Sequence, residues 1–305
     1  MLRRACTTLL LLATACSGDP PPAAPSPMAP TGPVIATTWP LTCLAEAMLA
    51  PEQSVRCLVP PGEDPAFWQP ADSDLQPLID ARGLLWNGAG FETWMQSATL
   101  APSRTLEVGQ AVRSTWIENT DESVHSHGAS GAHTHRGFDP HLWMDPLLCI
   151  EMARAIGDFA IAQDWIAPSQ AAERLAQLEP RLRELDRLWT EIAKAVQGRF
   201  LFANHGTYTY PARRYGIEIR VRNTSPEGPL DARTIESLSI ARAAGGAAGF
   251  LWESTPEPGL AAELQNTYGL ASFVLRPMES PLTPSQDAID IWRQDLTTLL
   301  KALQP

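Results

Sequence analysis

The sequence predicts an α/β protein with two lobes, each built on a mainly parallel sheet flanked by helices and joined by one long helix. Short apolar runs alternate with helical stretches both before residue 167 and after residue 197, as expected for strands joined by crossover helices. Between these regions, apolar residues recur every three or four positions. That spacing indicates one long amphipathic helix.

The first lobe is expected over residues 34–166. Its strand candidates are short runs of apolar and β-branched residues, at 34–38, 54–59, 83–86 and 105–108. Helical patterns lie between these runs, for example at 71–81. This order favours a parallel sheet, because parallel strands need crossover connections.

The linking helix is expected at 167–197 and the second lobe at 198–305. Strands of this lobe are expected at 200–203, 217–221, 249–252 and 272–275, with helices at 231–244, 259–268 and 284–303. The last helix has a start signal, since Thr283 precedes Pro284 and Gln286 can complete a capping box.

The N-terminus is expected to be an export signal over residues 1–15. Arg3 and Arg4 precede a short apolar stretch, which is too short to span a bilayer. Small residues before Cys16 resemble a bacterial lipobox, which implies a lipidated cysteine; the alternative is ordinary secretion with an incidental cysteine. Residues 16–33 are rich in proline and would form an extended tether. We therefore expect a periplasmic or cell-surface protein, held on a bacterial membrane by its lipid alone.

The composition and the absence of catalytic motifs exclude two classes of function. The net charge of −11 argues against nucleic-acid binding, and 44% hydrophobic residues can form real cores. No phosphate-binding glycine loop, nucleophile elbow or HExxH motif is present, so we do not expect an enzyme. We expect a monomer. An oxidising compartment would permit a disulfide between Cys43 and Cys57, which the sequence leaves open.

Five of the six histidines fall between residues 125 and 141. Four of them lie in a Gly- and Ser-rich segment, 123–136, namely His125, His127, His133 and His135. Imidazoles in a flexible loop can capture zinc, copper or nickel without a fixed geometry. The segment is therefore a candidate for auxiliary metal capture; the alternative is a merely polar loop.

The other two histidines have ordered surroundings. His141 lies between a proline and an apolar pair, and His205 follows the apolar strand predicted at 200–203. Side chains at the carboxyl end of a parallel strand face the crevice where α/β proteins bind ligands. Each histidine alone could be a structural hydrogen-bonding residue, but together they could close on a single ion from two lobes.

The sequence resembles the metal-binding receptors of bacterial ABC importers for zinc and manganese, over about residues 34–303. The resemblance rests on PPGEDP at 60–65, PADSDL at 70–75, LWNGAGFETW at 85–94, DPHLWMDP at 139–146, NHGTY at 204–208 and ARRYG at 212–216. It implies an extracytoplasmic receptor that binds Zn²⁺, or alternatively Mn²⁺, between two lobes and delivers it to an ABC permease.

The sequence departs from that family at two of four expected ligand positions. His141 and His205 match two ligands, but Ala66 stands where the first histidine is expected. Arg276 stands where an aspartate is expected. Two histidines alone would form a weak site, since zinc takes four ligands or three and water.

Carboxylates could complete the site. Glu63 and Asp64 precede Ala66, and Glu253 ends a predicted strand of the second lobe. Glu253 could instead form a salt bridge with Arg276. Asp139 either orients His141 or caps the following turn.

These departures leave a second function open. A degenerate receptor could bind no bare metal and take an anion, a metal chelate or a protein partner instead, with Arg276 holding an anion. Aromatic residues could line a cleft for such a ligand or serve ordinary core packing; they are Phe67, Trp68, Trp143 and Trp252.

Overall fold

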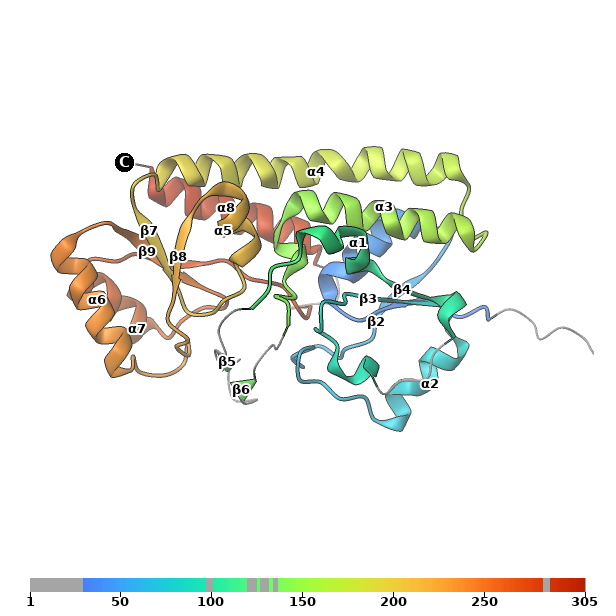
Figure 1. The fold of residues 1–305 in the computed structure, drawn as a ribbon, viewed down its shortest axis with the longest axis horizontal. Coiled ribbons are helices and arrows are strands. Elements are labelled where there is room, and N and C mark those ends of the chain that lie inside the picture. Colours follow the sequence, from blue (N-terminus) through green and yellow to red (C-terminus); the bar gives the residue numbers. More distant parts are fainter. Residues whose placement is uncertain are drawn as a thin grey trace, which may run out of the picture.

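The computed structural model describes residues 30–96, 101–119, 125–126, 132–133, 137–281 and 286–304. It contains two four-stranded sheets whose strand pairs are all parallel. The sheets lie side by side with helices packed around them (Figure 1). The predicted fold class is confirmed.

The first sheet has the strand order β2-β1-β3-β4. Its strands are β1 (Val34–Ala36), β2 (Val55–Cys57), β3 (Gly83–Trp86) and β4 (Thr105–Glu107). The strands alternate with α1 (Trp39–Leu49), α2 (Asp72–Asp80) and short 3₁₀ turns at Thr93–Gln96, Pro102–Arg104 and Val108–Thr115. The central strand β1 is fully buried, as expected for a sheet covered on both faces.

The second sheet has the order β10-β9-β7-β8. Its strands are β7 (Phe200–Ala203), β8 (Glu218–Val221), β9 (Ala247–Trp252) and β10 (Ser272–Val274). The connecting helices are α5 (Thr209–Tyr215), α6 (Ala232–Ala244) and α7 (Pro258–Glu263), which continues as a π-helical turn at Leu264–Tyr268.

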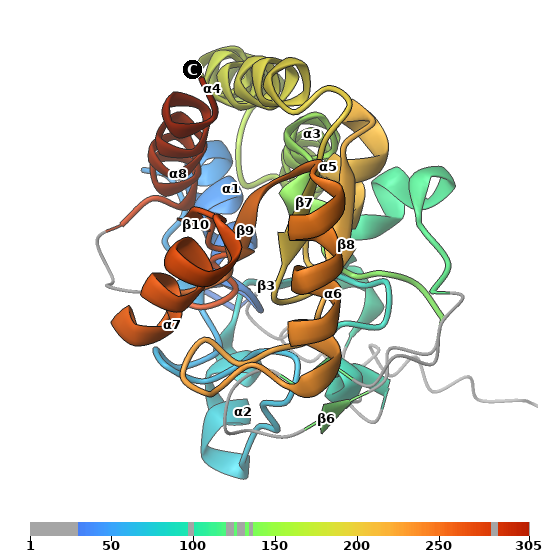
Figure 2. The same ribbon diagram turned by 90° about the vertical axis from the view of Figure 1, so that its left-hand side faces the viewer.

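Three long helices pack in a layer beside the two lobes. A 3₁₀ turn at Leu142–Met144 leads into α3 (Pro146–Ala162), then come α4 (Pro168–Ala195) and, at the end of the chain, α8 (Ala288–Leu303). Helix α4 runs along one side of both lobes and packs on α3 and α8 (Figures 1 and 2). Its buried residues follow the predicted helical spacing and include Leu178, Leu182, Leu185, Trp189 and Ile192. Burying such side chains is worth roughly 1.5–3 kcal/mol each, so the packing of α4 contributes to the stability of the fold.

All eight predicted strands of the two main sheets are confirmed, but one helix start was wrong. Helix α8 begins at Ala288, where the Asp287 side chain accepts a hydrogen bond from the backbone N–H of Ile289 at 2.8 Å. Residues 282–285, which include the expected start at Thr283 and Pro284, lie outside the described residues. No helix among the described segments is both long and apolar enough to cross a bilayer.

The histidine-rich segment is partly described. Residues 125–126 and 132–133 form a two-stranded antiparallel pair, β5 and β6, in which His125 lies opposite His133. The expectation of a segment without secondary structure is thus corrected for these four residues. His127 and His135 lie outside the described residues, as do the predicted export signal, Cys16 and most of the tether.

Candidate metal-binding site

His141 is held by the residue two positions before it. Oδ1 of Asp139 accepts hydrogen bonds from the His141 backbone N–H at 2.9 Å and lies 2.8 Å from His141 Nδ1. Both side chains are buried, His141 to 3% exposure and Asp139 to 5%. Because this contact occupies Nδ1, it leaves Nε2 as the ring nitrogen that faces away from Asp139. The geometry supports the hypothesis that Asp139 orients His141.

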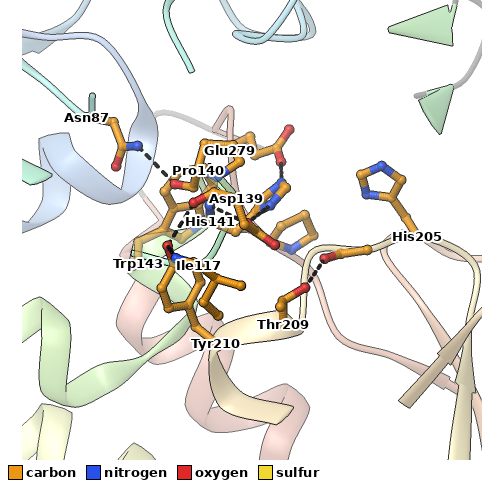
Figure 3. A network of polar contacts seen from close by, with 12 residues as sticks. Asn87, Ile117, Asp139, Pro140, His141, Trp143, His205, Thr209, Tyr210 and Glu279 are labelled. Carbon is orange, nitrogen blue, oxygen red and sulfur yellow. Dashed lines mark hydrogen bonds and ion pairs between the residues drawn. The ribbon is translucent and has the colours of Figure 1, made fainter. Parts of the chain in front are cut away.

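The turn that carries His141 is fixed by two side chains. The Asn87 amide at the end of β3 donates to the Pro140 carbonyl at 2.9 Å, and the Tyr210 hydroxyl from α5 donates to the Asp139 carbonyl at 2.8 Å (Figure 3). Asn87 is itself held by buried Glu92, which accepts from the Asn87 N–H at 2.7 Å. The His141 ring is thus set in place by residues from both lobes.

His205 stands at the carboxyl end of the opposite sheet. It follows β7, and Glu253 follows the neighbouring strand β9, so both side chains reach the same edge. Asn204 locks Glu253 in place, because its amide donates to Glu253 Oε1 at 3.0 Å and its Oδ1 accepts from the Glu253 N–H at 2.9 Å. The other carboxylate oxygen of Glu253 lies 3.5 Å from His205 Nδ1.

The two histidines meet between the lobes. Their ring centroids are 6.0 Å apart and the rings are nearly perpendicular, at 81°. Figure 3 shows the two rings approaching from different segments, one on the Asp139 turn and one beside the C-terminal sheet. The structure therefore brings together the two residues that the sequence suggested could share an ion.

A third donor was missed by sequence reasoning. Oε1 of Glu279 lies 3.3 Å from His141 Nε2, and the Glu279 side chain is about 10% exposed. The segment that carries it is pinned, because the Trp143 indole donates to the Pro277 carbonyl at 2.9 Å and the Trp39 N–H donates to the Glu279 carbonyl at 3.1 Å. Glu279 follows Arg276 by three residues. It is the acidic residue nearest to the position where an aspartate ligand was expected, and this proximity is the sequence signal that could have identified it.

Arg276 is engaged by a carboxylate of α8. Its guanidinium forms an ion pair with Asp295 of α8, through Nε at 3.0 Å and through a terminal nitrogen, and its backbone N–H donates to the same carboxylate at 3.1 Å. The salt bridge with Glu253 considered from the sequence is thus replaced by one to Asp295. This pairing neutralises the fixed positive charge that seemed to oppose a cation.

A pocket of about 230 Å³ adjoins the histidine pair. The loop 62–65 of the N-terminal lobe forms one wall and carries Glu63 and Asp64. The C-terminal lobe contributes Glu253, Arg276 and Glu279. Four carboxylates on its walls favour a cation over an anion. Aromatic side chains do not form this pocket's lining among the described residues. Instead Trp68, Trp143 and Trp252 are buried in the hydrophobic cores, so ordinary packing accounts for them.

The sequence-predicted carboxylates contribute unequally. Asp64 accepts a hydrogen bond from the Ala66 N–H at 2.9 Å, which shapes its own loop. Ala66 is buried within the hydrophobic core and supplies only a methyl group where a histidine was expected. Within the described segments, no three His, Cys, Asp or Glu side chains are gathered closely enough to hold a metal ion. The donors contact one another in pairs, His141 with Glu279 and His205 with Glu253.

The pairing has a marked effect on His141. Burial alone would lower its pKa, but Asp139 and Glu279 outweigh burial and raise the pKa of His141 to about 10. Burial likewise opposes ionisation of Asp139, yet His141 holds the pKa of that carboxyl below its ordinary value. The raised pKa favours the protonated form of His141 in the metal-free protein. A cation that binds Nε2 must displace that proton.

The cysteines in the described part of the chain are free thiols. Cys43 and Cys149 are buried and Cys57 is half-buried. The disulfide that the sequence left open between Cys43 and Cys57 is not formed in this structure. Burial is the main cause that raises the pKa of Cys43, to about 12, so this thiol is a poor metal ligand.

Comparison with known proteins identifies relatives that match most of this chain. A model of the family described as zinc-uptake complex component A, periplasmic, matches residues 34–302. The high-affinity zinc uptake system protein ZnuA of Bacillus subtilis is 23% identical over 277 residues, which cover 88% of this chain and 87% of that protein. The zinc-binding lipoprotein AdcA of Streptococcus pneumoniae is 22% identical over 89% of this chain, which spans only about half of AdcA, 55%.

A solved structure supports the same fold. The metal-dependent lipoprotein YcdH from Bacillus subtilis superimposes with a TM-score of 0.73 at 21% identity, covering 88% of this chain and 98% of that one. The two-lobed architecture is therefore shared almost from end to end.

Proposed function

Since the chain belongs to the periplasmic zinc-uptake component A family, we propose that it is the extracytoplasmic solute-binding component of a metal ABC importer. Proteins of this family are receptors and not enzymes, so the chain is a receptor. Its cargo would be a divalent cation, zinc, bound between the lobes and passed to the permease.

One observation carries this proposal. His141 and His205 come from different lobes and meet with their ring centroids 6.0 Å apart, beside a pocket lined by carboxylates. Two buried histidines that meet between lobes are unusual for hydrophobic packing, and a cation bound by both rings would account for their position. The family membership supports zinc as the first cation to test.

The donor set fits zinc better than manganese. Two imidazoles and a carboxylate are ordinary zinc ligands, whereas manganese prefers a shell dominated by oxygen. His141, His205 and Glu279 would bind the ion directly once their side chains move closer together than in the metal-free structure. Glu253, which lies 3.5 Å from His205 Nδ1, is a further candidate ligand. Glu63 and Asp64 lie across the pocket and would lower the energy of an entering cation. The ion would replace the contacts that now join each histidine to its glutamate.

Asp139 would keep His141 ready to bind. A carboxylate on Nδ1 fixes the ring orientation and raises the basicity of Nε2. The same carboxylate makes protons stronger competitors for Nε2, so binding would strengthen as pH rises.

Two further features belong to the proposal. The histidine-rich segment 123–136 would capture metal weakly and raise its concentration near the cleft. Cys16 would carry a lipid that holds the protein on the outer side of a membrane, with the proline-rich tether as a spacer.

The alternative of an anion or an anionic chelate gains no support from the site. The Arg276 guanidinium is engaged by Asp295, and the pocket walls carry four carboxylates. An anion would therefore meet repulsion from the carboxylates of the described walls. The adjoining His141 offers it no unpaired charge, because Asp139 and Glu279 lie against both of its ring nitrogens. If the protein does not bind zinc, a neutral chelate or a protein partner is the next ligand to test.

The proposal is tested by calorimetric titration of zinc into the body of the protein, from about residue 31. Two variants accompany the wild type: deletion of residues 123–136 and the double substitution His141→Ala/His205→Ala. We expect one tight site that survives the deletion and is lost in the double variant. Weak binding that depends only on residues 123–136 would overturn the proposal. Manganese, added as a competitor, should displace zinc only at large excess.

A further inference from the structure

The two arms that flank the histidine-rich segment come together just before His141. The Asp139 N–H donates to the Ile117 carbonyl at 2.8 Å, the Asn119 N–H donates to the Gly137 carbonyl at 2.9 Å, and Glu118 forms an antiparallel bridge with Phe138. These bonds make the base of the segment a short antiparallel ladder. Asp139, which orients His141, is a member of that ladder.

One rung of this ladder passes through a side chain of the other lobe. In an antiparallel pair that exchanges both backbone bonds, the Ile117 N–H would donate directly to the Asp139 carbonyl. Here the Ile117 N–H donates to the Tyr210 hydroxyl at 3.3 Å, and that hydroxyl donates to the Asp139 carbonyl at 2.8 Å (Figure 3). The phenol of Tyr210 is therefore inserted between the two arms.

Tyr210 has little freedom to leave this position. It belongs to α5 of the C-terminal lobe and is fully buried. Neighbours on the same helix also bind the N-terminal lobe: Arg213 donates to the Thr115 carbonyl, and Arg214 forms an ion pair with Asp145. Helix α5 thus holds the hydroxyl at a fixed place relative to the Asp139 turn.

We propose that Tyr210 is a positioning residue for metal binding, whose hydroxyl holds the Asp139 turn open and so aims His141 at His205. This inference rests on the proposed function for its metal readout. Without the hydroxyl, the arms can close to a direct bond of about 2.9 Å in place of the two-bond bridge. Closure would move the Asp139 carbonyl toward Ile117. Because Asp139 Oδ1 contacts His141 Nδ1, the His141 ring would move as well and would no longer point at His205.

The test compares Tyr210→Phe with Tyr215→Phe. Tyr215 lies on the same helix and its hydroxyl donates to Asp186 of α4 at 2.9 Å, away from the His141 turn. Each substitution removes one phenol hydroxyl and keeps the ring. Urea unfolding of both variants shows whether they keep comparable stability. Asn87→Ala serves as a positive control, because it releases the neighbouring Pro140 carbonyl.

Zinc affinity is the first readout, by competition with a chelator. We expect Tyr210→Phe to weaken zinc binding about tenfold, as for the loss of one or two hydrogen bonds that position a ligand, and Tyr215→Phe to stay within about twofold of the wild type. Equal affinities in the two variants would overturn the proposal.

Histidine ring signals in the metal-free protein are the second readout. With ¹⁵N-labelled histidine, Tyr210→Phe and Asn87→Ala should move the His141 nitrogens and leave those of His205 in place, whereas Tyr215→Phe should move neither. Unmoved His141 signals in Tyr210→Phe would refute the positioning role even if wild-type zinc binding failed. If wild type binds no zinc but the His141 signals move as expected, the proposed function fails and the positioning role stands.

Discussion

Zinc binding should release a proton from His141. Asp139 and Glu279 raise the pKa of His141 to about 10 in the metal-free protein. At pH 7 such a group is deprotonated in about one molecule in a thousand, which weakens the apparent affinity about 1,000-fold, or by roughly 4 kcal/mol. The apparent association constant should therefore rise about tenfold per pH unit between pH 6.5 and 8.

The perturbation that isolates this effect is Asp139→Asn. It removes the carboxylate that contributes most to the raised pKa while leaving an amide of similar shape. Calorimetry at pH 7.5 in buffers of different ionisation enthalpy counts the protons released on binding. We expect the variant to release fewer protons than the wild type, by most of one proton, and to show a shallower pH dependence. Equal proton counts in the two proteins would refute the assignment of the proton to His141.

Three further results are expected. Glu279→Gln should weaken zinc binding at least tenfold because it removes a charged ligand, whereas Glu63→Gln, on the far wall of the pocket, should change it less than threefold; equal effects would exclude Glu279 as a ligand. The metal-free protein should lose stability as pH rises from 6.5 toward 10. The folded protein holds the His141 proton more tightly than the unfolded chain, so this contribution is complete only below the unfolded pKa of 6.5 and is lost by about pH 10. Urea unfolding of His141→Ala should lack this decline. Arg276→Ala should cost about 2–4 kcal/mol of unfolding free energy, because buried Asp295 loses its guanidinium partner, yet zinc affinity should stay nearly unchanged. A large loss of affinity would place the guanidinium in the site.

Local pattern was enough to predict the sheets. The strands at 83–86 and 200–203 have the predicted bounds because each is a short apolar run bounded by polar or turn residues. Helix α1 was expected between the first two strands but without bounds, since nine of its eleven residues are buried and it therefore lacks an amphipathic period. Helix α5 was missed because it has only seven residues.

The candidate site could be predicted from the sequence where a residue follows a strand or a motif, and not where its position depends on distant contacts. His141 and His205 could be paired from their positions in the sequence. The direction of Arg276 depends on Asp295, nineteen residues further on in α8. Glu279 contacts His141 after Met278, which adopts a left-handed backbone conformation with φ of 62°. No sequence pattern predicts that conformation at a methionine.

The central claim is that one cation binds between the lobes at His141 and His205. It is tested most directly by anomalous diffraction at the zinc absorption edge, from crystals of zinc-loaded protein lacking residues 123–136. We predict a single strong peak within about 2.0–2.2 Å of nitrogen atoms of both histidines and of a Glu279 oxygen. No peak between the two rings, in protein that calorimetry shows to be zinc-loaded, would contradict the account.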